Sequence, residues 1–240
     1  MKASYVLLLC AAISLLIVLR YLQSAPARLL SAHVINMDSS VERLGEFMAT
    51  ARAAKLDVVR WPAYNGHNIC EADLTPMKLS KYIYKYGQEH NQPGLLGCYV
   101  SHRSLLNHLA STSARAGDAH LILEDDAYVP PDFWAQWAAV AAELPDDWDV
   151  VQLGVTFPNL RPVVNGGKLH RHLNDKGNVG GFAYVVRHGS LPKICKYVEY
   201  MSDPMDVMLR NKWRSWKMYV VWPEICPHND HGESVIVDKK

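Results

Sequence analysis

Three adjacent carboxylates, Glu124, Asp125 and Asp126, directly follow the apolar run HLIL at residues 120–123. Such a run is typical of a fully buried strand, and ligands of open α/β sheets bind beyond the carboxyl ends of the strands. If the extended geometry persists, Glu124 and Asp126 project to one side and Asp125 to the other. Paired carboxylates suit Mg²⁺ or Mn²⁺, which prefer oxygen ligands.

The alternative is that the triplet consists of solvated charges at a strand end, or caps the helix expected after residues 130–132 (PPD). Three neighbouring carboxylates repel one another, however. A buried strand that ends in them needs a cation or a firm hydrogen-bond network to hold them together. We therefore interpret the triplet as a site for Mn²⁺ or Mg²⁺.

The elements that position this triplet alternate between strand and helix, which predicts an α/β fold with a mostly parallel central sheet. Residues 69–93 are expected to be irregular or partly helical, and residues 154–181 form a long loop rich in Gly, Asn, His and Arg. Apolar periodicity predicts strands at 32–37, 57–61, 120–123, 148–153, 182–186 and 218–222, and helices at 41–55, 98–110, 133–144, 190–200 and 206–213.

The amino-terminal segment has the pattern of a targeting signal, with Lys2 before an apolar stretch over residues 5–19. The stretch is shorter than the roughly 20 residues of a membrane span, a gap that helix tilt can close. We predict an uncleaved anchor at 1–23, a short stem at 24–30 and a catalytic domain at 31–240. Cleavage near residues 25–27 (APA), giving a secreted protein, and a buried core helix are the alternatives.

An anchor of this kind predicts a single-pass type II membrane protein, in the Golgi or endoplasmic reticulum lumen if the chain is eukaryotic. The charge is nearly balanced, with 25 basic and 24 acidic residues, which argues against nucleic acid as a partner. Without a CxxC pair, a structural zinc cluster is not expected. The four cysteines after the anchor form one or two disulfides or stay as buried thiols: Cys70, Cys98, Cys195 and Cys226.

Three ordered blocks of this sequence resemble glycosyltransferase family 25, which includes lipooligosaccharide and collagen galactosyltransferases. They are VINMD at 34–38 with Arg43, GCYVSH at 97–102 and ILEDD at 122–126. Weaker similarities follow at 149–154, 180–187, 204–206 and 227–236. The resemblance covers most of the chain after the predicted anchor, and three blocks in order are more specific than any one.

The resemblance implies a Rossmann-like domain of the GT-A type that transfers a hexose, galactose or glucose, from a UDP-sugar with inversion. The acceptor would be a hydroxyl of a glycan or a protein. Glu124 and Asp126 would stand in for the metal-binding D-x-D motif of the family, with Asp126 as the first choice of ligand. The residues implied to bind the nucleotide-sugar are Asn36, Asp38, Arg43, Ser101, His102 and Asp125.

Inverting transfer also needs a base near the acceptor hydroxyl. Asp206 is the candidate because it begins a predicted helix after Pro204, on the acceptor side in the family comparison. Asp203 is the fallback, and capping of the helix is the alternative role of Asp206. His228 is a candidate metal ligand, as is His231, although a lone histidine more often has a structural role.

Two other functions are compatible with these residues. One is a non-catalytic protein that binds nucleotide-sugars or glycans on the same scaffold. It would bind the donor without turnover. The other is a metal-dependent phosphohydrolase, which would release phosphate from nucleotides without a sugar acceptor.

Overall fold

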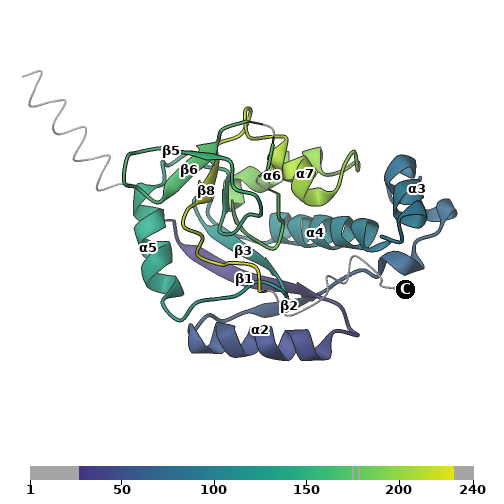
Figure 1. Cartoon of the computed structure of the whole chain (residues 1–240), viewed down its shortest axis with the longest axis horizontal. Helices are drawn as coiled ribbons and strands as arrows, with labels where there is room; N and C mark the ends of the chain where they lie inside the picture. The colour runs from purple at the N-terminus through teal and green to yellow at the C-terminus, as the bar shows by residue number, and fades with distance from the viewer. Residues whose placement is uncertain (1–26, 175, 178, 230–240) are drawn as a thin grey trace, which may run out of the picture.

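A computed structural model describes residues 27–174, 176–177 and 179–229 of the chain (Figure 1). Over these residues, an eight-stranded sheet forms the centre of the molecule, in the order β2-β1-β3-β7-β4-β8-β6-β5. The strands are β1 (Leu29–Asn36), β2 (Val59–Pro62), β3 (Ala119–Glu124), β4 (Val150–Gln152), β5 (Leu160–Pro162), β6 (Leu169–His172), β7 (Ala183–Arg187) and β8 (Met218–Val221).

The sheet is mixed, so the prediction of a mostly parallel sheet is wrong. Within the described residues, β1 pairs in parallel with β2 and β3, and β4 pairs in parallel with β8. The other four pairings are antiparallel. The reason is β7, which lies antiparallel between β3 and β4, together with the β5–β6 hairpin that extends the far edge through β8.

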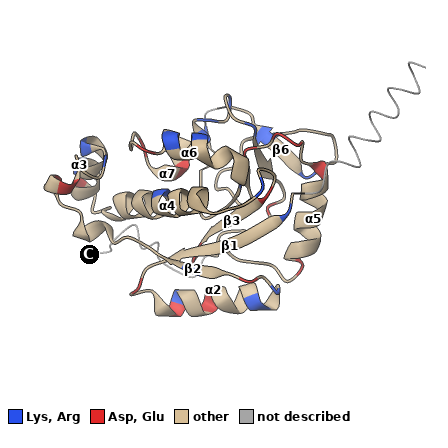
Figure 2. Cartoon of the chain, turned by 180° about the vertical axis from the view of Figure 1, so that it is seen from behind, with Lys and Arg blue, Asp and Glu red and all other residues tan. Residues whose placement is uncertain are grey.

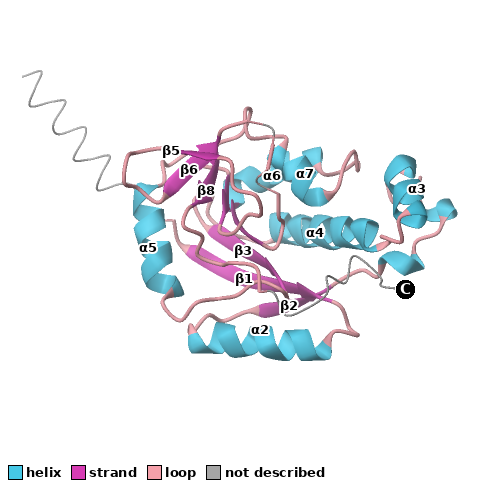
Figure 3. Ribbon diagram, viewed as in Figure 1, coloured by secondary structure: helices cyan, strands magenta, loops and turns pink. Residues whose placement is uncertain are grey.

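Helices cover both faces of the sheet, as Figure 3 shows in cyan against the magenta strands. One face packs against α2 (Val41–Ala53) and α5 (Phe133–Glu143), and the other against α4 (Gly94–Ser111), α6 (Leu191–Tyr197) and α7 (Met205–Arg210). The helix α3 (Lys81–Glu89) contacts α4 beyond the sheet. The described part of the chain is therefore a three-layer α/β/α domain.

Side-chain alternation along the strands builds the two cores. In β1, Val34 belongs to the core under α2 and α5, whereas the next residue, Ile35, belongs to the core under α4 and α6. Leu121 and Ile122 of β3 divide in the same way. This is the period of two that a strand buried on both faces requires, and it explains the continuous apolar runs of the sequence.

Most predicted elements are confirmed, with three differences in detail. The predicted loop 154–181 contains the strands β5 and β6, whereas α3 agrees with the partly helical character expected of residues 69–93. The helix α4 begins at Gly94, four residues before the predicted start. The strand β1 begins at Leu29, so the last two residues of the predicted stem belong to the sheet.

The predicted anchor, residues 1–23, lies outside the described residues. In the part of the chain that the structure describes, no helix combines the length and the apolarity that a membrane crossing requires. All four cysteines of this part carry free thiols, so the alternative of disulfides is wrong. Acidic and basic side chains are both present along α2 (Figure 2), in keeping with the balanced charge of the sequence.

Candidate active site

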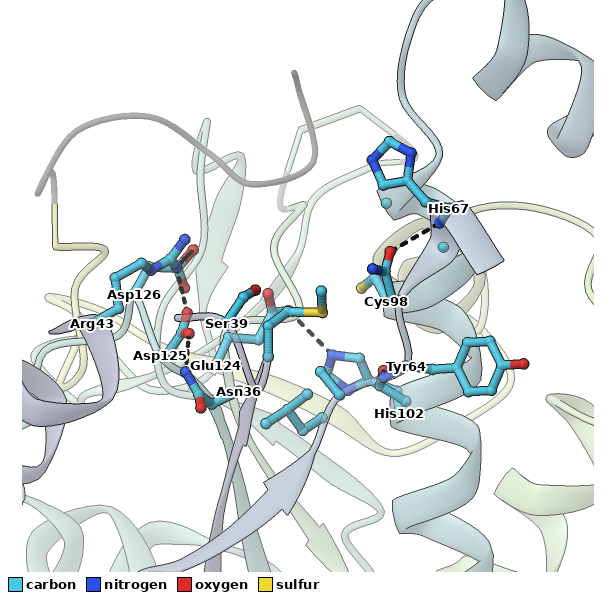
Figure 4. Close-up of a pocket in the computed structure, with 17 residues that line it drawn as sticks. Asn36, Ser39, Arg43, Tyr64, His67, Cys98, His102, Glu124, Asp125 and Asp126 are labelled. Carbon is cyan, nitrogen blue, oxygen red and sulfur yellow. Dashed lines mark hydrogen bonds and ion pairs between the residues drawn. The ribbon is translucent and has the colours of Figure 1, made fainter. Parts of the chain in front are cut away.

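A cleft of about 290 Å³ opens where β1 and β3 end beside the first half of α4 (Figure 4). We call it the first cleft. Its walls come from the turn after β1, the loop around the short 3₁₀ helix η1 (Gly66–Asn68), the start of α4 and the acidic triplet. The prediction that a site lies beyond the carboxyl end of β3 agrees with this position.

The acidic triplet begins at the last residue of β3 and continues into a tight turn. The strand ends at Glu124, and the N–H of Ala127 donates to the Glu124 carbonyl at 3.1 Å. The extended geometry assumed from the sequence therefore stops at Glu124. All three carboxylates line the first cleft, and Glu124 and Asp126 also line a second cavity that Asp125 does not reach.

Asp125 is bound by residues from β1 and α2. Its Oδ2 accepts a hydrogen bond from Asn36 Nδ2 at 2.7 Å, and its other oxygen pairs with the Arg43 guanidinium. Burial raises the pKa of Asp125, while the Asn36 hydrogen bond and the Arg43 charge oppose the rise. These contacts bring Asn36 and Arg43, from the first of the three sequence blocks, to a carboxylate of the third.

Asp126 has a different environment. Its Oδ2 lies 3.2 Å from Arg43 and 3.4 Å from Nε2 of His228, whereas its Oδ1 is buried without a hydrogen-bond partner among the described residues. Burial, followed by the charge of Glu124, raises the pKa of Asp126 to about 6. A further cation at the unpartnered oxygen would therefore stabilise the charged form of Asp126.

The backbone near the carboxyl end positions His228 against the triplet. Residue 228 forms an antiparallel bridge with Ala127, and the N–H of Asn229 donates to the Asp126 carbonyl at 2.6 Å. The side chain of His228 packs edge-on against Phe182, with 5.5 Å between the ring centres. His231, the second tail histidine considered from the sequence, lies outside the described residues.

Glu124 contacts the opposite wall, because its Oε1 lies 3.1 Å from Nε2 of His102. The imidazole of His102 is fully buried, and its Nδ1 hydrogen-bonds the hydroxyl of Tyr184 at 2.9 Å. Figure 4 shows Glu124 between the Arg43–Asp125 pair and His102. Glu124 therefore connects the acidic triplet to His102 of the sequence block 97–102.

A second cleft, of about 330 Å³, lies on the other side of the triplet. Asp206, the predicted base, lines it together with the shared residues Cys98, Glu124 and Asp126. Asp206 accepts hydrogen bonds from the N–H of Gly180 at 3.2 Å and from the N–H of Val207 at 2.8 Å. It therefore stabilises the start of α7, as the capping alternative held, and faces the cleft as well.

Comparison with known proteins identifies the family. Residues 30–156, more than half of the chain, match the family described as glycosyltransferase family 25 (LPS biosynthesis protein). The chain belongs to glycosyltransferase family 25. The recognition from the three sequence blocks is confirmed, because all three lie inside the matched range, whereas Asp206 and His228 lie beyond it.

The comparison with curated proteins returned no match. Among solved structures, the chain is similar to one described as the apo-form glycosyltransferase GlyE in Streptococcus pneumoniae TIGR4, with 7% identity and a TM-score of 0.36. That similarity covers 80% of this chain and 44% of the other, so this chain spans less than half the length of that protein.

Two residues predicted to bind the donor have other contacts in the structure. Asp38 does not line the first cleft. Its side chain is 86% exposed and pairs with Arg60 at 2.5 Å. Ser101 lines the cleft, but its hydroxyl accepts from the N–H of Tyr64 at 2.8 Å and donates to the Gly97 carbonyl at 2.6 Å. Ser101 therefore holds the loop of Tyr64 against α4.

Three residues of the site were not assigned a role from the sequence. Arg60 donates to Asn36 Oδ1 at 2.9 Å and so fixes the amide that binds Asp125. The sequence feature that could have singled out Arg60 is its position as a lone charged residue in the apolar segment VVRW at 58–61. Cys98 lines both clefts, and its spacing of four from His102 within one helix indicated a shared face. Tyr184 had no distinguishing local signal.

The residues at the junction of the two clefts fit a divalent cation. Glu124, Asp126 and His228 all line the second cleft and supply carboxylate and imidazole ligands, which suit Mn²⁺. The buried Oδ1 of Asp126, which has no hydrogen-bond partner among the described residues, is available to a cation. Among the described residues, however, the ligand atoms that converge within 4.8 Å of one another are those of Cys98, His102 and Glu124, so the predicted set of Glu124, Asp126 and His228 stays a prediction.

Proposed function

We propose that this glycosyltransferase transfers a hexose, glucose or galactose, from a UDP-sugar to a hydroxyl of a glycan or protein, with inversion and with a divalent cation. One observation carries the proposal: two clefts meet at Glu124 and Asp126, with the Asn36–Arg43 region on one side and Asp206 on the other. A transfer between two substrates needs this arrangement, since donor and acceptor must reach a common point.

The first cleft suits the nucleotide and its diphosphate. Arg43 is 23% exposed at its side chain and already balances Asp125 and Asp126, so it stands beside the position of the leaving group. Gly94, at the first turn of α4, also lines this cleft. The partial positive charge of a helix amino terminus favours the phosphate oxygens. A bound cation at Glu124 and Asp126 would polarise the phosphoryl oxygens and neutralise charge on the leaving diphosphate.

The second cleft suits the acceptor. In an inverting reaction, the acceptor hydroxyl attacks from the face opposite the leaving group and loses its proton to a base. Asp206 supports this role because it lines the second cleft and is held by two backbone N–H groups. His102 and Tyr184 fix the orientation of Glu124 between the two substrates.

A turnover assay tests this assignment. Purified enzyme is incubated with UDP-glucose or UDP-galactose and Mn²⁺, and release of UDP is followed with and without a panel of glycan acceptors. Replacement of Asp206 by Asn should reduce the acceptor-dependent rate by at least about 100-fold, because general base catalysis contributes on this scale. Donor binding should remain.

The matched control is Asp203→Asn, which changes a partly exposed carboxylate that lines neither cleft. Its acceptor-dependent rate should stay within a factor of two or so of the wild type, in line with the small effects of surface changes. If Asp206→Asn transfers sugar as fast as Asp203→Asn, Asp206 is not the base.

The amino-terminal segment belongs to the same proposal. We propose that residues 1–23 anchor the enzyme as a single-pass type II membrane protein, with the catalytic domain on the far side of the membrane from the cytoplasm. The pattern of Lys2 before an apolar stretch supports it. Membrane fractionation after alkaline extraction, with and without residues 1–26, tests the anchor, since a cleaved signal would leave the domain in the soluble fraction.

A further inference from the structure

Cys98, His102 and Glu124 form a cluster in which the Cys98 thiol has no role in the proposed transfer. Cys98 and His102 are four residues apart on α4 and therefore lie on one face of the helix, which turns toward the end of β3. The thiol, an imidazole nitrogen and a carboxylate oxygen of the three side chains all lie within 4.8 Å of one another. Figure 4 shows His102 directed toward Glu124.

The hydrogen bond to Tyr184 prepares His102 as a ligand. A metal-binding histidine usually has its second ring nitrogen fixed by another group, which sets the tautomer and the direction of the free lone pair. Here Nδ1 lies 2.9 Å from the Tyr184 hydroxyl, so Nε2 is the nitrogen that faces Glu124. A hydroxyl donates or accepts, and His102 can therefore present Nε2 to Glu124 as an N–H group or to a cation as a lone pair.

Space beside these atoms is maintained by Gly181. A Cβ at this position would lie 3.4 Å from Glu124 Oε1 and 3.8 Å from His102 Nε2. The absence of a side chain thus leaves room next to the two ligand atoms. Cys98 and Glu124 line both clefts, so an ion reaches the cluster from either one.

The ligand set differs in chemistry from the carboxylate pair. A thiolate, an imidazole and one carboxylate are characteristic of zinc, whereas Mg²⁺ and Mn²⁺ prefer oxygen ligands. Tetrahedral zinc needs its ligand atoms about 3.4–3.6 Å apart, as follows from bonds of about 2.0–2.3 Å. The His102 and Glu124 atoms are 3.1 Å apart, and the Cys98 thiol lies within 4.8 Å of both.

The charge around Cys98 also favours a cation. The carboxylates of Glu124, Asp126 and Asp206 line the second cleft together with Cys98. A site with this negative potential attracts a divalent ion, which then stabilises the thiolate.

We propose that Cys98, His102 and Glu124 form a binding site for a thiophilic divalent cation of the zinc class, and that its occupation inhibits sugar transfer. On binding, the sulfur–metal bond forms as the Cys98 thiol releases its proton to solvent, and no group changes its oxidation state. Inhibition follows because Glu124 is withdrawn from the site of the donor cation. Only this inhibitory part rests on the proposed function, since the binding itself does not depend on it.

Cobalt(II) spectroscopy of the full-length protein tests the binding. Cobalt(II) takes zinc sites and gives an intense near-ultraviolet band only when a thiolate is a ligand. After treatment with a chelator, the wild type should bind about one equivalent of Co²⁺ with this band, and Zn²⁺ should displace it. Cys98→Ser should remove the band and weaken zinc affinity, measured by competition with a chromophoric chelator, at least about tenfold.

Two further variants keep the test informative if Cys98→Ser folds poorly. Tyr184→Phe retains all three ligands but removes the hydroxyl at Nδ1, and zinc affinity should fall about tenfold or more. Cys70→Ser removes an exposed thiol that lines neither cleft, so both the band and the affinity should match the wild type. The proposal is overturned if the wild type lacks the thiolate band, or if the band survives in Cys98→Ser.

The Asp126→Asn variant separates this site from that of the donor cation. Asp126 belongs to the proposed Mn²⁺ site but not to the thiol cluster, so this variant should lose Mn²⁺ binding and keep zinc binding. Loss of zinc binding in Asp126→Asn together with its retention in Cys98→Ser would show that zinc occupies the carboxylate site instead, and would overturn the proposal.

Inhibition is read from rates normalised within each variant. At saturation, zinc should lower the rate of Mn²⁺-supported transfer by the wild type at least about tenfold, and excess Mn²⁺ should restore that rate. In Cys98→Ser, the ratio of the rate with zinc to the rate without zinc should rise toward one. A thiolate band without any donor binding would contradict the proposed function and leave the zinc site intact. Bound zinc without inhibition would overturn the inhibitory part.

Discussion

Acidification should destabilise this protein through His120, a buried histidine at the start of β3. His120 is 1% exposed, and its two ring nitrogens lie 2.8 Å from the Ser31 hydroxyl and 3.0 Å from Nδ1 of His188. Burial, followed by the charges of His188 and His33, lowers the pKa of His120 from 6.5 to about 4, while Asp118 opposes the shift. His120 therefore stays neutral in the folded state at a pH where the unfolded chain binds a proton.

The sign and the size of the effect follow from this difference. Above pH 6.5 the ring is neutral in both states, so His120 contributes no pH dependence. As the pH falls below 6.5, only the unfolded state gains a proton, and the free energy of unfolding decreases until the folded-state pKa of about 4 is passed. The predicted loss from His120 is about 2 kcal/mol at pH 5 and about 3 kcal/mol below pH 4.

Urea unfolding followed by tryptophan fluorescence at pH 7 and pH 5 measures this loss. Other groups, including His172, whose pKa is also lowered to about 4 by burial, contribute to the pH dependence of the wild type. The test is therefore a difference between variants. In His120→Gln, an uncharged side chain that still forms hydrogen bonds, the loss between pH 7 and pH 5 should be smaller by about 2 kcal/mol.

The exposed His90 of the α3 end provides the control, and His90→Gln should show the same loss as the wild type. The reasoning is refuted if His120→Gln loses as much stability on acidification as His90→Gln. That result would mean that His120 already binds a proton in the folded state at pH 5.

Three further predictions concern packing, a buried hydrogen bond and the donor site. Gly97→Ala should lower the free energy of unfolding by about 1–3 kcal/mol in urea titrations, because a Cβ would overlap the backbone of the loop that leads into η1. Gly45→Ala is the control: its Cβ would meet nothing within 4 Å, so the free energy of unfolding should rise by about 0.5–1 kcal/mol. Tyr99→Phe removes the bond from its buried hydroxyl to the Val198 carbonyl at 2.6 Å, and thermal unfolding should reveal a loss of about 1–3 kcal/mol. Arg43→Gln should raise the KM for the UDP-sugar about tenfold or more, and an unchanged KM would exclude Arg43 from the donor site.

The sequence was sufficient for the elements with strong local signals. Residues 121–123 are a continuous apolar run, which is typical of a strand buried on both faces, and the carboxylates after it mark the end of that strand. The spacing of the apolar residues in α4 and α5 likewise predicted helices. The strand and its carboxylates were enough to predict a site at the end of β3, whereas residues 34–38 and 97–102 were assigned to that site from the family resemblance.

The remaining features depend on contacts between residues that are far apart in the sequence. The direction of β7 relative to β3 follows from the path of residues 154–181, and apolar periodicity does not encode strand direction. His228 reaches Asp126 only because the backbone near the carboxyl end pairs with the turn after β3. The pairing of Asp38 with Arg60, which draws Asp38 away from the cleft, depends in the same way on the register of β1 and β2.

The central claim is that a divalent cation links a UDP-sugar to the carboxylates of Glu124 and Asp126. Isothermal titration with UDP-glucose and UDP-galactose, with and without Mn²⁺, tests it most directly for the wild type and Asp126→Asn. We predict binding of at least one donor to the wild type that strengthens about tenfold or more with Mn²⁺, and no gain from Mn²⁺ in Asp126→Asn. Equal donor affinity with and without Mn²⁺ in the wild type, or an undiminished gain in Asp126→Asn, would contradict the account.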